Sequence, residues 1–524
     1  MSASTEKKQR QAAREAGTDK KTLAEQEAAK KKAKSNRRWT LGTIGVILLI
    51  ALILFLNSSF LYTHTTAISV GDASYSPAEV SYVYANRYYN WIQSYGSYAS
   101  IFGLDTSTGI AGLKQQECPM YDDGRTWHDY FMEEARSELS QMTALCAWAD
   151  ANGVTLTDEE IAEVDDSIAT LDSSARAGGY ASGDKYFSAN YGTGVTSAIV
   201  REMALKSALA NKASSEYAAS LEYTDTELEE HYQSLDGAQD KFSFSYYLVN
   251  AEKVESTDAD GNTSSAVTEE TTAAAKDAAD DILTAYTALK QSNPDDDNYT
   301  AMLNSAVAQV APTAEATERS NITGGNLGDY KEWLMASGRK TGDATVVDKA
   351  DGSGSYVVVF LDRSDNHYPV AQVRHILIKA VADSDGSYTD KAKEIAKNRA
   401  EEILAEFNAG DKTEDSFAEL AKDYSEDTGS AENGGLYDTV YKGATVEEFD
   451  KFCFEGHKKG DTAIVYGESS SYAGYHVMYY VGEGDLYSNL LAKNDLVNTT
   501  VSQWLEDQVD ALTVTNGWWL RIAG

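Results

Sequence analysis

Two consecutive stretches of the chain repeat one order of predicted elements, which limits this part of the fold to a tandem arrangement. Each stretch runs from a strand through a long helix, a short helix and an aromatic–glycine–basic–glycine–aspartate turn to an apolar closing strand. The first copy opens with residues 242–249, which alternate as a half-buried strand does, and closes with 356–361. The second copy opens with 373–379 and closes with 475–481. We therefore expect an internal duplication, with each copy a small α+β domain.

A mainly helical domain is expected before the repeats, over residues 66–240. Ser76 with Glu79 forms a capping-box pattern that starts a helix, and two Thr-x-x-Glu patterns repeat it further on. Tyrosines crowd the first of these helices, and we expect core packing with half-exposed rings. The alternative is a binding surface, because tyrosine combines apolar area with a polar tip. The last segment, 487–524, has apolar residues at helical spacing and is expected to pack back on an earlier domain.

The charge of the chain changes sign near its beginning. Residues 1–38 hold twelve basic and five acidic residues, whereas the remainder holds 33 basic and 77 acidic residues. An uncharged run that begins at Trp39 and is extended to Tyr62 is long enough to span a bilayer as a helix. Basic residues directly before it place the N-terminus in the cytoplasm by the positive-inside rule. We therefore expect a basic cytoplasmic leader over 1–38, a single-pass anchor in the cell membrane over 39–62, and extracellular domains after it.

Two alternatives to the anchor differ in how the apolar run is used. A cleaved signal peptide would have a shorter leader, a shorter apolar run and a small-residue cleavage site. A lipid-anchored precursor would carry a cysteine after the run, and none follows it directly. The anchor is therefore preferred over both.

Composition excludes several classes of function. The net charge of −37 argues against a general nucleic-acid binder, whose partner would require a basic surface. Three cysteines exclude a disulfide-dense scaffold and offer no repeated metal-ligand spacing, although Cys118 and Cys146 leave one disulfide open. The motifs of serine hydrolases, zinc proteases and phosphate-binding loops are absent from the sequence.

The second copy carries an ordered set of motifs that is specific. Four of the seven histidines lie in it or at its entrance. Five motifs follow one another, namely Val-Arg-His-Ile-Leu-Ile-Lys at 373–379, Tyr-Ser-Glu-Asp-Thr-Gly-Ser at 424–430, Gly-Gly-Leu at 434–436, Phe449 with Phe454, and Gly-Tyr-His-Val at 474–477. This set resembles the parvulin-type peptidyl-prolyl isomerases, and the whole layout is similar to that of the extracytoplasmic foldases of this class.

The resemblance implies a division of labour along the chain. It assigns a helical chaperone-like domain to 66–240, a degenerate parvulin-like repeat to 241–366, the isomerase domain to 367–486, and a C-terminal helix that returns to the chaperone part. It further implies unfolded secreted proteins as partners, cis–trans isomerisation of their X-Pro bonds as the activity, and no cofactor or metal. The clients, the residue preferred before proline and the oligomeric state are not given by the sequence.

The resemblance also assigns roles to residues. His375 and His476 fall on the paired histidines of the family, and Asp427 falls where members have Cys or Asp beside the substrate carbonyl. Five substrate-binding positions follow, of which Thr445 and Ala473 depart from the methionine and the small hydroxyl residue usual there: Leu436, Thr445, Phe449, Phe454 and Ala473. After the glycine pair at 434–435, Leu-Tyr-Asp replaces the usual Asp-Leu-Gly.

Physical chemistry supports such a site without a cofactor. Rotation about an X-Pro bond takes tens to hundreds of seconds because it breaks amide resonance. A catalyst needs an apolar slot for the proline ring and polar groups that favour the twisted amide. Phe449, Leu436 and Phe454 can form such a slot, and two facing strand histidines can hydrogen-bond each other and fix their tautomers around Asp427.

Less specific interpretations stay open. The histidine pair could be an ordinary buried hydrogen bond between strands, and a metal site built from the pair and Asp427 matches no common spacing. A holdase that only binds unfolded chains is the alternative function. In the first copy the position of His375 falls within 245–247, and because no histidine lies between 232 and 366 we expect this copy not to catalyse.

Overall fold

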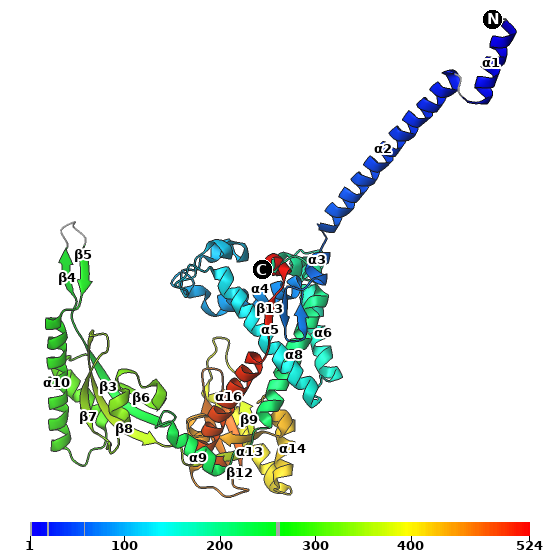
Figure 1. The fold of residues 1–524 in the computed structure, drawn as a ribbon. Helices are drawn as coiled ribbons and strands as arrows, with labels where there is room; N and C mark the ends of the chain where they lie inside the picture. The colour runs from blue at the N-terminus through cyan, green and yellow to red at the C-terminus, as the bar shows by residue number, and fades with distance from the viewer. Residues whose placement is uncertain (1–2, 18–19, 57, 258–262) are drawn as a thin grey trace. The chain divides into compact units, whose positions relative to one another are not determined.

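The computed structural model describes residues 3–17, 20–56, 58–257 and 263–524 (Figure 1). The chain divides into two compact units. One comprises the residues up to Leu221 together with 499–524, and the other comprises 222–498. The first is mainly helical and the second combines helices with two sheets, so the fold is of the expected α+β class.

The first unit is built on helices that begin where the capping patterns place them. Ser76 Oγ accepts from the Glu79 backbone N–H while the Glu79 carboxylate accepts from the Ser76 N–H, and Thr157 makes the same box with Glu160. Three short strands form a sheet in the order β13-β1-β2. The elements are α1 (Ala3–Glu15), α2 (Lys20–Leu56), α3 (Phe60–His64), β1 (Ile68–Val70), β2 (Ala73–Tyr75), α4 (Pro77–Tyr95), α5 (Trp127–Asn152), α6 (Asp158–Ala177), α7 (Gly183–Asn190), α8 (Ser197–Ala219) and β13 (Val514–Asn516).

Most tyrosines of α4 belong to the core of this unit. Tyr84 and Tyr88 are 1% and 5% exposed and contact Phe131 edge-on. Tyr95 and Tyr98, at the end of the helix and beyond it, are about half exposed. The core interpretation of the tyrosine-rich helix therefore accounts for its first half.

The C-terminal segment packs back on the helical unit. The helix α16 (Tyr487–Asp510) begins in the second unit, and its residues from Thr499 onward belong to the first. Trp504 stacks on Tyr217 of α8 with ring centroids 4.0 Å apart. Beyond α16, β13 pairs antiparallel with β1. The return of the C-terminal helix is therefore present in the fold.

The predicted anchor over 39–62 is not a single helix. The uncharged run forms the second half of α2, which begins in the charged leader at Lys20 and ends at Leu56, and the separate helix α3 begins only at Phe60. Among the described residues, no helix combines the length and the apolar content needed to cross a bilayer.

The cysteines are free thiols. Cys118 and Cys453 are buried and Cys146 is half-buried. Burial raises the pKa of all three thiols, that of Cys453 to about 12. The disulfide between Cys118 and Cys146 that the sequence left open is not formed.

The second unit contains two four-stranded antiparallel sheets of one topology. The first has the order β6-β3-β8-β7 and the second β10-β9-β12-β11, so each opening strand lies beside its closing strand at the centre. This shared order is what an internal duplication predicts. The strands are β3 (Lys241–Asn250), β6 (Thr317–Thr323), β7 (Ala344–Asp348), β8 (Gly354–Ser364), β9 (Pro369–Lys379), β10 (Leu436–Val440), β11 (Thr462–Glu468) and β12 (Ala473–Leu486).

Helices cover both faces of each sheet. In the first repeat α10 (Glu269–Ser292) and α11 (Tyr299–Val310) cover one face and α12 (Lys331–Met335) the other. In the second repeat α13 (Asp390–Ala409) and α14 (Glu414–Tyr424) cover one face and α15 (Glu447–Phe454) the other. A two-stranded hairpin of β4 (Val254–Thr257) and β5 (Thr263–Ala266) is inserted after β3.

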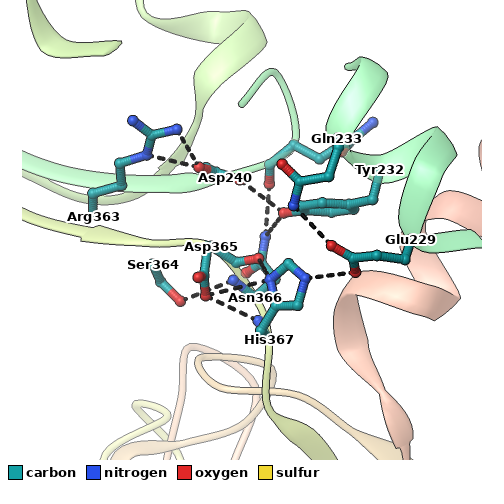
Figure 2. Close-up of polar contacts among 10 residues, drawn as sticks. Glu229, Tyr232, Gln233, Asp240, Arg363, Ser364, Asp365, Asn366 and His367 are labelled. Atoms are coloured by element: carbon teal, nitrogen blue, oxygen red, sulfur yellow. Dashed lines mark hydrogen bonds and ion pairs between the residues drawn. The ribbon is translucent and has the colours of Figure 1, made fainter. Parts of the chain in front are cut away.

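A buried polar cluster joins α9 (Asp225–Ser234) to the linker between the two sheets (Figure 2). Asn366 is fully buried and donates through Nδ2 to the Tyr232 hydroxyl over 2.9 Å, and that hydroxyl donates to Asp240 over 2.8 Å. His367 Nε2 lies 2.8 Å from the Glu229 carboxylate. These bonds explain why α9 groups with the second unit, although the sequence placed it at the end of the helical domain.

Candidate active site

The two predicted histidines meet on one face of the second sheet. His375 lies in β9 and His476 in β12, and the two strands are antiparallel neighbours. His375 pairs with Met478, so the two rings are diagonal neighbours on the face that α15 covers. Both side chains are buried, at 2% and 4% exposure, and their Nδ1 atoms lie 3.0 Å apart.

Asp427 lies in the loop after α14 and lies against the second nitrogen of His375. Its Oδ2 is 3.0 Å from His375 Nε2 and accepts from the Ser430 hydroxyl over 2.6 Å and from the Tyr437 hydroxyl over 3.1 Å. Its Oδ1 accepts from the Gly429 N–H. The hydrogen bond from His375 holds the pKa of this carboxyl well below its usual range, against the opposing effect of burial. The group is therefore an ionised carboxylate that only accepts.

These contacts connect both imidazoles to the carboxylate. Because Asp427 only accepts, His375 donates to it from Nε2. The Nδ1 atoms of the two rings form a second hydrogen bond, and His476 Nε2 lies 3.0 Å from the Tyr472 hydroxyl. Burial, and secondly the neighbouring His375, lower the pKa of His476 to about 3, so this ring is neutral at neutral pH. The result is one continuous chain of hydrogen bonds from Tyr472 to Asp427.

A cavity of about 340 Å³ opens above this chain. The Phe449 ring forms part of its wall and meets both imidazoles edge-on, with centroids 5.4 Å from His375 and 5.2 Å from His476. The cavity wall thus combines apolar side chains with the end of the hydrogen-bond chain that lies opposite Asp427, at His476 and Tyr472. The residues that line the cavity are His375, Tyr437, Ala444, Thr445, Val446, Phe449, Tyr472 and His476.

Thr445 supplies an unused hydroxyl in the wall. Its Oγ1 is buried and has no hydrogen-bond partner among the described residues. A buried hydroxyl without a partner costs about 1–3 kcal/mol, so native proteins usually satisfy such groups. A ligand carbonyl in the cavity would satisfy this one.

The remaining three predicted positions lie outside the cavity wall. Leu436 pairs with Arg374 across the sheet, and Phe454 lies edge-on to Tyr368 with centroids 5.7 Å apart. Ala473 is fully buried, and its carbonyl accepts from the Ala380 N–H. Leu436, Phe454 and Ala473 thus belong to the supporting packing and not to the cavity.

Two of these positions are direct sequence neighbours of residues that do line the cavity. Tyr437 follows Leu436 and Tyr472 precedes Ala473, and each tyrosine reaches the polar chain that its neighbour misses. Successive side chains of a strand point to opposite faces, so a one-residue difference decides which of the two faces the cavity. Sequence reasoning missed both tyrosines, although the alternation of β10 around Leu436 was a signal for the first.

Strand pairing identifies the corresponding positions of the first repeat. Gly354 pairs with Asn250 at the end of β8, as Gly474 pairs with Lys379 at the end of β12. Counting from these pairs, Tyr246 stands at the position of His375 and Tyr356 at that of His476. The two tyrosine rings meet edge-on at 5.8 Å, on the face that α12 covers.

The first repeat therefore keeps the sheet and loses the acid–histidine chain. Tyr330 packs against both tyrosines of the pair, with ring centroids 5.8 Å from Tyr246 and 5.4 Å from Tyr356. Burial raises the pKa of Tyr330 to about 12, so the hydroxyl stays protonated. A cluster of three tyrosine rings thus replaces the ionised carboxylate and the imidazoles of the second repeat.

Comparison with known proteins identifies the domain that carries the cavity. Residues 357–480 match the PPIC-type PPIase domain. The chain is 30% identical over 146 residues to Foldase protein PrsA 3 of Bacillus anthracis, which covers 28% of this chain and 43% of that protein. It is 36% identical over 103 residues to Chaperone SurA of Alcanivorax borkumensis, covering 19% of this chain and 21% of that protein. The parvulin-type resemblance of the second repeat is thereby confirmed.

The likeness does not extend over the whole of these relatives. The chain spans less than half the length of both curated proteins. A crystal structure of PrsA from Bacillus subtilis aligns with 74% of this chain and 88% of that chain at 14% identity. Its TM-score of 0.28 is too low to support an argument about the arrangement of the units.

Proposed function

We propose that the second repeat isomerises X-Pro peptide bonds and that the proline ring occupies the cavity beside Phe449. This proposal rests on the hydrogen-bond chain that runs from Tyr472 through both histidines to Asp427. An aromatic-lined cavity opens beside this chain. The match of residues 357–480 to the PPIC-type PPIase domain supports it.

The chemistry asks for stabilisation of a twisted amide and for no covalent step. In the twisted state the amide loses resonance, and its carbonyl oxygen and nitrogen no longer share charge as they do in the planar form. Phe449 and Val446 take the proline ring out of water, while the Thr445 hydroxyl is free to donate to a carbonyl oxygen. The acid–histidine chain holds the floor of the cavity in one protonation state, so little reorganisation is needed during rotation.

Asp427 acts in this proposal chiefly by position and charge. Four donors already surround its oxygens, so it is held rigidly and its charge faces the cavity through His375. The first repeat offers no equivalent carboxylate–imidazole chain, and we propose that it does not catalyse. Its role would be binding, as part of the extended surface for unfolded chains.

The remaining parts of the proposal concern clients and location. We propose that the helical unit binds unfolded secreted chains, in keeping with the names of the relatives, which are a foldase and a chaperone. We also propose that residues 39–62 hold the chain at a membrane, with 63–524 outside. The uncharged run and the basic residues before it support this placement. Retention of the chain in carbonate-washed membranes tests the anchoring, and release into the wash would contradict it.

The test of the activity is the rate at which the full chain isomerises a short proline-containing peptide. The wild-type chain is expected to accelerate the reaction, and His375→Ala and Asp427→Ala are expected to reduce the acceleration strongly. Acceleration that survives both substitutions would show that the cavity is not the site. No acceleration by the wild-type chain, together with protection of an aggregating client, would favour a holdase. Thr445 and Ala473, which depart from the family pattern, are the reason to carry that second candidate.

A further inference from the structure

The helix α6 leaves its apolar stripe partly open in the helical unit. Val164, Ile168 and Leu171 recur at helical spacing, the pattern of a helix that buries one face. The first two are only half-buried, and Leu171 is 41% exposed. Ala175 is the only buried residue of α6. The apolar stripe therefore has the composition of a buried core surface, but the neighbouring elements leave it partly exposed.

A groove of about 390 Å³ runs along this open stripe. It lies between α6 and α8, which pack against each other, and Tyr82 of α4 contributes to it. On the α8 side the groove is lined by Ala204 and Ala208, whose small side chains leave room between the helices. The lining is mostly apolar, with two acidic side chains among it, Glu160 and Glu163.

The charge around the groove is negative because acidic side chains far outnumber basic ones along α6. Lys212 binds Glu160 over 2.8 Å, and Arg201 binds Asp165. Glu163 in the groove wall has no ion pair among the described residues, nor have Asp158, Glu159 and Asp166 on the same helix.

We propose that this groove binds an apolar client segment that is flanked by lysine or arginine. This inference rests on the chaperone part of the proposed function and names the chemistry of the chains it would hold. Apolar side chains of the client complete the open stripe of α6, and burial of about one such side chain per turn stabilises the complex. The long stems of lysine and arginine lie along apolar surface while their charged ends reach Glu163.

The test uses two labelled synthetic peptides of about four helical turns. They share leucine and isoleucine at helical spacing and differ only in their flanks, which are lysine in one and glutamate in the other. Binding to the full chain is followed by fluorescence anisotropy at low and at high salt. We expect the lysine-flanked peptide to bind about tenfold more tightly at low salt and to lose most of this advantage at high salt.

Matched substitutions locate the binding site. Glu163→Lys is expected to weaken the lysine-flanked peptide about fivefold, because it reverses one charge in the wall. Asp166→Lys makes the same change on the same helix away from the groove lining and is expected to alter binding less than twofold. Leu171→Ser is expected to weaken both peptides about fivefold, since it removes apolar contact area from an exposed position.

Three outcomes would overturn the inference. The first is equal binding of the two peptides, and the second is an equal effect of Glu163→Lys and Asp166→Lys. The third is self-association of the chain that Leu171→Ser abolishes, which would make a second copy the occupant. Protection of an unfolded client by the wild-type chain, measured alongside, separates these failures from a failure of the proposed chaperone function.

Discussion

At the scale of single residues, the site depends on a carboxylate that orients two buried rings. Asp427 accepts from His375, the other nitrogen of His375 meets His476, and His476 in turn meets Tyr472. Tyr437 also donates to Asp427, and burial raises the pKa of its hydroxyl to about 12. The hydroxyl is therefore protonated and able to donate at neutral pH.

Thr445→Val separates activity from stability. The substitution keeps the shape of the side chain and removes a buried hydroxyl that has no partner among the described residues. We expect the free energy of unfolding to stay equal or to rise by about 1 kcal/mol. We expect kcat/KM for a proline peptide to fall about threefold to tenfold, because a donor to the substrate is lost. Thermal unfolding and peptide kinetics on the same samples decide the matter, and unchanged kinetics would remove Thr445 from the site.

His476 makes the stability of the second repeat depend on pH. Its pKa of about 3 in the folded chain lies below the ordinary value of about 6.5, so the unfolded chain takes up a proton first as pH falls. The contribution of this residue is therefore complete above pH 6.5 and is lost progressively between 6.5 and 3. By pH 5 the loss is about 2 kcal/mol.

The titration of His476 can be observed directly. We expect its ring resonances to stay at their neutral positions down to pH 5, and we expect His476→Gln to reduce the loss of stability over the same range. Asp427, whose pKa is held low, stays ionised throughout and does not confuse the result. A ring that titrates near pH 6.5 would contradict the buried neutral assignment.

At this scale the sequence predicted the residues of the hydrogen-bond chain more surely than those of the cavity wall. His375, His476 and Asp427 stand in motifs whose order along the chain is fixed, and the structure places them in contact. Tyr437 and Tyr472 were missed because strand register, and not composition, determines which of two neighbours faces the cavity. Such register depends on contacts between distant strands.

At the scale of elements, the edge strand β10 brings the hydroxyl of Tyr437 to Asp427. Gly435 precedes it with a φ of 69°, and its N–H donates to the Ser430 carbonyl over 2.8 Å. The carbonyl of Gly435 accepts from the His375 N–H over 2.9 Å. A side chain at this position would separate the two strands where the site is assembled.

Gly435→Ala is the corresponding test. An added Cβ would lie 2.1 Å from the His375 carbonyl oxygen, so the strands must move apart. We expect the free energy of unfolding to fall by about 3 kcal/mol or more, and we expect the isomerase activity to be lost. Gly456→Ala is the matched control, because Gly456 has a similar positive φ of 81° but open space around it. This substitution is expected to lower the free energy of unfolding by about 1 kcal/mol and to leave the activity intact. Equal effects of the two substitutions would contradict the close strand contact.

The sequence predicted the elements well where local signals act. The capping boxes at Ser76 and Thr157 start helices as expected, and the repeated order of elements appears as two sheets of one topology. The uncharged run was expected to form its own helix, yet α2 extends through the charged leader as well. Helix ends that lack capping signals depend on wider context, which the apolar run alone did not reveal.

At the scale of the whole molecule, two sheets share one topology, and the acid–histidine chain lies on the second of them. The tyrosine pair of the first repeat occupies the positions of the histidine pair of the second. The helical unit is completed by the far end of the chain, through β13 and the stack of Trp504 on Tyr217. The unit therefore combines residues separated by most of the sequence.

Trp504→Ala tests this closure. Loss of the stacked ring is expected to lower the stability of the helical unit by about 2–4 kcal/mol. Trp518→Ala, at a ring that is 69% exposed, serves as the control and is expected to cost less than about 1 kcal/mol. Thermal unfolding with a probe in the helical unit measures both. A Trp504→Ala chain as stable as the control would show that the return of the C-terminal helix is not needed for this unit.

The most direct measurement of the central claim is the cis–trans exchange rate of an X-Pro peptide at saturating concentrations of the chain. NMR exchange spectroscopy gives this rate separately from the binding affinity. For Asp427→Asn, which keeps the shape and removes the charge, we predict a fall in the accelerated rate of about 10- to 100-fold with little change in Kd. Asp438→Asn, at an exposed position of β10, should leave both unchanged. Full acceleration by the Asp427→Asn chain would contradict the claim that the acid–histidine chain drives the isomerisation.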